Sequence, residues 1–148
     1  MENIVSSIIA IVEQMEVKTQ EQFVIAVLDR LSFFGYEASC NDDWLIAFCI
    51  QKVINHIMNS CNTNYLPNGL FFVAVDRVCG EFLYSINSSG KLELDNIDLS
   101  GSIKEIVEGD ITLKFSDASS DAEKFSILVD YLKNEGASDE ICYRKLKW

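Results

Sequence analysis

The chain has 148 residues, 49% of them hydrophobic and only one a proline, a composition typical of one globular domain rather than a disordered segment. Its formal net charge of -11 argues against a generic nucleic-acid-binding surface, because phosphate binding needs clustered lysines and arginines. We expect no signal peptide and no membrane span, and the five cysteines without C-x-x-C spacing favour a reduced, cytosolic compartment.

The first 35 residues are predicted to form two amphipathic helices. Apolar side chains recur every three or four positions over residues 2–15, which is the spacing of one helix face. Thr19 and Gln22 form a capping-box pattern that predicts the start of a second helix, and Gly35 is expected to stop it. The positions expected to face the core in this second helix are Phe23, Val24, Ala26, Val27, Leu28 and Leu31.

A third helix is predicted over residues 44–61. Asn41 or Asp42 is the expected N-cap, because short polar side chains accept hydrogen bonds from the first N–H groups of a helix. Residues 62–69 contain Pro67, the only proline, and are predicted to form a loop. The positions expected to face the core in this third helix are Trp44, Leu45, Phe48, Cys49, Val53, Ile57 and Met58.

A fourth helix is predicted over residues 70–86 and is expected to be central, because it is apolar on nearly every face. Gly80 favours close packing with a neighbouring helix, since glycine otherwise costs up to about 1 kcal/mol inside a helix. Asp76, Arg77 and Glu81 are the charged exceptions. Either Arg77 pairs with Glu81 along the helix, or the three residues form a subunit interface.

The helical core is predicted to comprise residues 1–88, and residues 89–118 are expected to project from it. This segment would contain a polar, mobile stretch over 91–101, a short helix over 102–108 and a strand or arm over 111–115. The arm could pair with another strand of the chain or add to a neighbouring subunit. Its candidate contact residues are Ile111, Leu113, Lys114 and Phe115.

A final helix is predicted within residues 119–136. Ser120 and Glu123 form a second capping signal, and Gly136 is expected to end the helix. The sequence therefore predicts a mainly α fold, a bundle of about five helices with an extended middle segment, a short β arm and an extended C-terminal tail. The apolar positions expected to face the core in the final helix are Phe125, Leu128, Val129 and Leu132.

Residues 137–148 are predicted to form the extended tail. Its last six residues hold three positive charges and no acid, whereas the other 142 carry 9 Lys and Arg against 23 Asp and Glu. Two interpretations are open: a strand over 141–148 that closes the domain, and a tail that docks on a partner. The candidate docking residues are Tyr143, Arg144, Lys145, Leu146, Lys147 and Trp148.

The sequence gives no catalytic, cofactor-binding or metal-binding signature. His56 is the only histidine and has no cysteine or carboxylate at ligand spacing, and Cys61 would lie on another face of the same helix. The acid pairs at 42–43 and 139–140 occupy turn or cap positions, where carboxylates favour a helix start. We therefore expect neither an enzyme nor a cofactor.

Residues 66–84 resemble the pattern LPEGL-x-x-VAVD-x-V-x-GEFL of the head-tail connector (adaptor) proteins of tailed phages and prophages of Gram-positive bacteria. Other segments match the family in the same order, so the resemblance covers nearly the whole chain. The last of them matches its YRK-x-KW ending. These further segments are residues 42–46, 51–53, 88–92, 102–110 (the SIKEGD region, with Val107 as an extra residue) and 143–148.

The resemblance implies an α-helical adaptor, of which about twelve copies form a ring beneath the portal protein at the head vertex. Such a ring extends the DNA channel and carries the next neck or tail protein, in the neck of a virion assembled in the host bacterial cytoplasm. An acidic lumen would let DNA pass without specific binding. The arm over 111–115 would line the channel or reach a neighbour, and Arg144, Lys145, Lys147 and Trp148 would anchor the ring to the portal.

Two alternative functions are open. Another neck component, such as a stopper or a tail terminator, belongs to the same class but tends to be richer in β structure. A small cytosolic helical enzyme or regulatory binding module would have to use Cys61 and His56, and it should show converging polar residues rather than apolar faces and caps.

Overall fold

The computed structural model describes residues 2–12, 17–101 and 120–146 of the chain. Within these ranges the protein is mainly helical and holds no strand, so the predicted mainly α class is confirmed. No described helix is both long and apolar enough to cross a lipid bilayer. The α-helices are α1 (Glu2–Ile11), α2 (Val17–Phe33), α3 (Asp43–Cys61), α4 (Phe71–Ser88), α7 (Asp121–Asn134) and α8 (Ala137–Tyr143), and the two 3-10 turns are η1 (Asn68–Leu70) and η2 (Leu94–Asn96).

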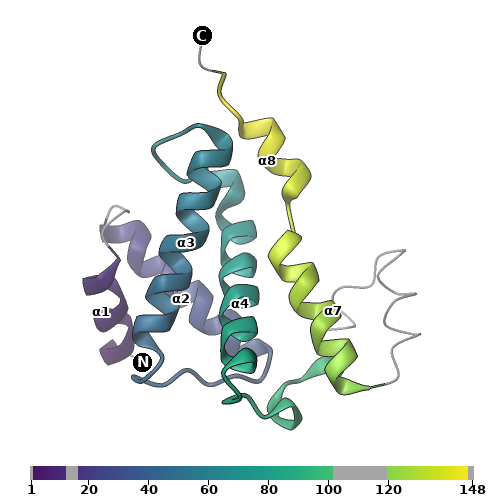
Figure 1. Ribbon diagram of the computed structural model, residues 1–148. Coiled ribbons are helices and arrows are strands. Elements are labelled where there is room, and N and C mark those ends of the chain that lie inside the picture. The colour runs from purple at the N-terminus through teal and green to yellow at the C-terminus, as the bar shows by residue number, and fades with distance from the viewer. Residues whose placement is uncertain (1, 13–16, 102–119, 147–148) are drawn as a thin grey trace.

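Helix α4 lies at the centre of the bundle, as its apolar sequence predicts (Figure 1). It packs against α2, α3 and α7, while α1 covers α2 and α3 on the far side from α7. Gly80 allows the close approach of α7, because a Cβ atom at this position would lie 2.9 Å from Leu132 Cβ and 3.1 Å from Lys133 N. The largest fully buried side chains include Phe23, Phe34, Phe82, Ile50 and Leu128.

The core face of α3 differs from the prediction. Trp44 and Phe48 were expected inside, but they are 63% and 50% exposed. Their rings stack on the surface with centroids 5.6 Å apart, as residues four positions apart on a helix can do. Leu45 and Met58 are partly buried against the core, whereas Cys49, Val53 and Ile57 are buried as expected. The buried side chains of α3 are Ile46, Ala47, Cys49, Ile50, Val53, Ile54, Ile57 and Cys61.

The predicted capping residues mark the start of some helices but not of others. Helix α7 begins at the predicted capping box, in which Ser120 accepts a hydrogen bond from Glu123 N at 3.2 Å. Helix α2 begins before Thr19, so the predicted capping box lies inside it and that prediction is wrong. The N-cap of α3 is Asp42, whose side chain accepts from Ser39 rather than from the helix. Residues 13–15 of the first predicted helix lie outside the described residues.

Residues 91–101 pack on the bundle, which corrects the prediction that this polar stretch projects from it. Ile97 and Leu99 are buried, and Asp98 N donates to Phe34 O at 2.9 Å. Gly35, with φ of +88°, ends the turn after α2 and lets Asn96 O approach where a side chain would collide.

The C-terminal region is not an extended tail from residue 137, because residues 137–143 form α8 (Figure 1). No strand forms over the described part of 141–148. The short helix over 102–108 and the arm with Ile111, Leu113, Lys114 and Phe115 lie outside the described residues, as do Lys147 and Trp148.

Candidate functional site

The last described residues fold back on the C-terminal end of α3. Lys145 N donates to Cys61 O at 2.8 Å, and Arg144 Nε donates to Ser60 O at 3.1 Å. Asn62, in the left-handed conformation with φ of 54°, donates its side-chain N–H to Lys145 O at 2.9 Å. The backbone N–H of Lys145 and the guanidinium of Arg144 therefore complete the end of a helix, where unpaired carbonyls accept hydrogen bonds and the negative end of the dipole favours positive charge.

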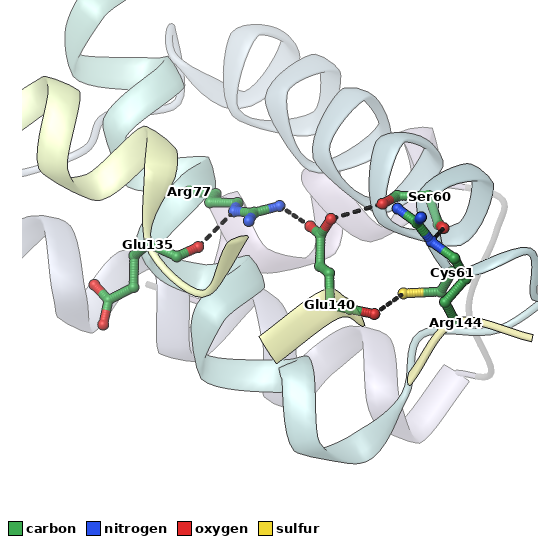
Figure 2. A network of polar contacts seen from close by, with 6 residues as sticks. All are labelled: Ser60, Cys61, Arg77, Glu135, Glu140 and Arg144. Carbon is green, nitrogen blue, oxygen red and sulfur yellow. Dashed lines mark hydrogen bonds and ion pairs between the residues drawn. The ribbon is translucent and has the colours of Figure 1, made fainter. Parts of the chain in front are cut away.

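A buried ion pair holds α8 to the bundle (Figure 2). Arg77 of α4 pairs with Glu140 of α8, and the two side chains are only 7% and 8% exposed. Arg77 Nε also donates to Glu135 O at 2.9 Å, and Ser60 Oγ donates to Glu140 at 2.7 Å. Each charge thus has a counter-charge and a further hydrogen bond, the condition under which buried charges are tolerated.

Helix α8 presents its apolar side chains to solvent. Glu140 is its only buried residue, whereas Ile141 and Tyr143 are 64% and 40% exposed. Leu146, just beyond the helix, is 70% exposed. We call Ile141, Tyr143 and Leu146 the C-terminal patch, next to which Lys145 lies over the ring of Tyr65. Exposed large apolar side chains of this kind occur at protein interfaces and also singly on free surfaces.

The stacked pair Trp44 and Phe48 forms a second exposed apolar site. It lies near the start of α3, whereas the C-terminal patch lies beside the end of this helix (Figure 1). Trp44 and Cys61 are 17 positions apart on α3, which corresponds to about 25 Å of helix. The described body therefore carries exposed aromatic or aliphatic side chains near both ends of its long axis.

The three charged residues of α4 have partners from other helices. Arg77 does not pair with Glu81, so the predicted intrahelical pair is wrong. Asp76 accepts from Arg30 Nε at 2.7 Å, and Glu81 pairs with Lys52 at 2.8 Å and Lys133 at 3.7 Å. Contacts within the chain account for these charges, and a subunit interface through them stays a prediction.

The carboxyl groups of Glu135 and Asp76 lie together beside Arg30. Burial, and secondarily the charge of Asp76 and a hydrogen bond to it, raise the pKa of the Glu135 carboxyl above its usual value. Tyr131 and Arg30 oppose this shift. The arrangement joins the α7–α8 link to α4 and α2.

A polar groove of about 740 Å³ lies between α3, α4, α7 and α8. Its charges largely neutralise one another through the pairs of Arg77 with Glu140 and of Glu81 with Lys52 and Lys133. Its lining residues are Lys52, Val53, Asn55, His56, Asn59, Arg77, Glu81, Asp130, Lys133, Asn134, Ala137 and Glu140.

His56 and Cys61 show no nucleophile–base arrangement. His56 lines the groove, whereas Cys61 is fully buried outside it and directs its thiol to Glu140 O at 3.7 Å. Burial, with the charge of Glu140, raises the pKa of the Cys61 thiol, which disfavours the thiolate that a nucleophile needs. Among the described residues no group of three or more His, Cys, Asp and Glu could hold a metal ion.

Comparison with family models, with curated proteins and with solved structures finds no match for this chain.

Sequence reasoning missed the importance of Glu140, which was assigned to a helix start. One local signal bears on it: Arg77 lies in a helix that is otherwise apolar on most faces, so it requires a buried acid nearby. Periodicity could not say which of the 23 acidic residues supplies it.

Proposed function

We propose that this protein is a structural head-tail connector of a phage or prophage particle. In this role about twelve copies form a ring beneath the portal, extend the DNA channel and carry the next neck or tail protein. The ordered set of motifs between residues 42 and 148 that resemble this family carries the proposal. The mainly helical fold agrees with the fold that the resemblance implies.

Two groups of exposed apolar residues, near the two ends of α3, are candidate contacts with different partners. The C-terminal patch, with Arg144 and Lys145 beside it, is the proposed portal-facing surface. The Trp44–Phe48 pair is the proposed contact for the downstream neck or tail protein. Exposed aromatic side chains supply much of the binding energy at protein interfaces, so both sites suit docking.

The acidity of the body supports passage of DNA rather than its capture. Outside the last six residues, 9 Lys and Arg face 23 Asp and Glu, so a ring lumen formed by this body would repel phosphate. In this proposal the protein resides in the neck of the virion, after assembly in the host cytoplasm, and needs neither a cofactor nor a membrane.

No observation specifically favours either alternative function. A stopper or tail terminator is expected to be richer in β structure, and residues 2–12, 17–101 and 120–146 contain no strand. An enzyme using Cys61 would need an accessible thiolate, and this thiol is buried with a raised pKa.

The test is the substitution Leu146→Asp in the gene of the particle-producing strain, with particles imaged by electron microscopy. Leu146 is chosen because deleting the whole tail would also remove Arg144 and Lys145 from the end of α3. We expect filled heads without attached tails, whereas the matched control Ile25→Asp, on exposed Ile25 of α2, should give complete particles. Complete particles from a strain that lacks the gene would refute the connector function itself.

A further inference from the structure

Helix α8 is attached to the rest of its own chain mainly by polar contacts. No apolar side chain of α8 is fully buried, although the Tyr143 ring lies against Gly69, and the other contacts, which form the seat of α8, are polar: Arg77, the Ser60 hydroxyl and the carbonyls at the end of α3. Such a seat recognises one acid in one position and gains little from general hydrophobic burial. Any α8 segment with a correctly placed Glu140 can therefore fill it.

The connection between α7 and α8 is only two residues long, Glu135 and Gly136. Gly136 has φ of +69°, which favours glycine, and a Cβ atom there would lie 2.6 Å from both Cγ atoms of Val73. The closed form thus depends on a glycine in the left-handed region and on its close approach to α4. Helical dihedrals at this link would instead join α7 and α8 into one straight helix and carry α8 away from its own seat.

We propose that α8 and residues 144–146 are exchanged between copies of this chain, so that Glu140 of one copy pairs with Arg77 of another. The exchange regains the contacts that α8 and residues 144–146 make with the seat, because the seat and the segment are identical in each copy, whereas the contacts of the link, such as that of Glu135 O with Arg77, change. A short link between two elements is the feature that favours this kind of exchange. Reciprocal exchange gives a closed dimer, and exchange in one direction around a circle gives a ring.

Exchange of α8 depends on the geometry of this helix and its link, and not on the connector function. A connector ring could form through other surfaces without exchange, and an exchanging protein need not be a connector. Both experiments below use the purified chain alone, so their outcome is separate from that of particle imaging.

The first experiment substitutes the link. Gly136→Ala strains the closed form but suits a straight α7–α8 helix, so the oligomer-to-monomer ratio measured by native mass spectrometry should rise about tenfold, from the cost of a left-handed non-glycine residue. Gly90→Ala is the matched control, because Gly90 also has a positive φ, +71°, but has open space around it and lies far from α8 along the chain. A Gly136→Ala protein as monomeric as this control would overturn the proposal.

The second experiment uses complementary charges. Arg77→Glu leaves two acids at the seat, Glu140→Arg leaves two bases, and each variant alone should be destabilised as a monomer or a homodimer. When the two variants are refolded together, each body can find an oppositely charged partner only in the α8 of the other variant. A one-to-one hetero-dimer should therefore appear in native mass spectrometry. The double variant Arg77→Glu, Glu140→Arg measures how far a reversed pair restores the closed form. If this double variant folds and the mixture yields no hetero-dimer, the exchange is refuted.

Discussion

Arg77 and Glu140 pair inside the protein although 63 positions separate them in the chain. Arg77 belongs to the central helix α4, and Glu140 is the only buried residue of α8. This pair therefore decides where the C-terminal segment lies, and with it the two residues that cover the end of α3.

Replacing Glu140 by glutamine should destabilise the fold by about 3 kcal/mol, because Arg77 is then buried without a counter-charge. Glutamine keeps the size of the side chain and can still accept the hydrogen bond from Ser60. Urea unfolding measures the loss, and hydrogen exchange should show the largest change in α8. The control is Asp139→Asn, at the exposed neighbouring acid; if it costs as much as Glu140→Gln, the ion pair is not the cause.

Replacing Gly80 by alanine should destabilise the protein by roughly 1–3 kcal/mol, because the new methyl group would overpack the contact with Leu132 and Lys133. Helix propensity acts in the opposite direction, since alanine is favoured over glycine by up to about 1 kcal/mol inside a helix. Thermal unfolding measures the balance. A Gly80→Ala variant more stable than the wild type would show that α7 can move aside at little cost.

Replacing Glu135 by glutamine should stabilise the protein at neutral pH. The pKa of Glu135 is raised in the folded state, so the folded protein binds this proton more tightly than the unfolded chain, and stability falls as pH rises from the usual value of 4.5 through the folded pKa. Glutamine removes this loss, so urea midpoints should depend less on pH within that window. The control is Glu21→Gln, at an exposed acid of α2; if it changes the urea midpoints as much as Glu135→Gln does, the effect is not specific to the Glu135 site.

Thiol labelling should divide the five cysteines into two groups. Burial raises the pKa of Cys49 to about 12 and that of Cys79 well above its usual value, and Cys61 is buried as well. A maleimide at neutral pH should therefore modify only exposed Cys40 and Cys142 in the folded protein, and all five cysteines in denaturant. Mass spectrometry counts the adducts, and rapid labelling of Cys61 in the native protein would argue for frequent opening of α8.

Much of the bundle could be predicted because its signals are local. The apolar character of residues 70–86 indicates a central helix, Gly35 and Gly136 mark helix ends, and Ser120 with Glu123 forms the capping box that begins α7. Each of these depends on residues within one or two helical turns, so no knowledge of distant partners is needed.

The face of α3 and the path of α8 depend on distant partners, and the sequence-based predictions were wrong there. On α3 the aromatic pair Trp44 and Phe48 and the aliphatic row through Ile46 and Ile50 are both at helical spacing, and only the neighbouring helices decide which is buried. Helix α8 has no buried apolar stripe from which its position could be predicted, since its only buried residue is an acid. The cationic residues Arg144 and Lys145 were predicted to serve a partner, yet they also complete a helix of their own chain.

The way in which α3 ends has a consequence for the order of folding during synthesis. The carbonyls of Ser60 and Cys61 find their partners in residues that the ribosome adds more than 80 positions later. A nascent chain that has reached the end of α4 already contains Arg77 but not yet its acid. Because a domain generally folds as a unit, the first four helices lack the partner of Arg77 and the donors to the end of α3 until the C-terminal residues have been added.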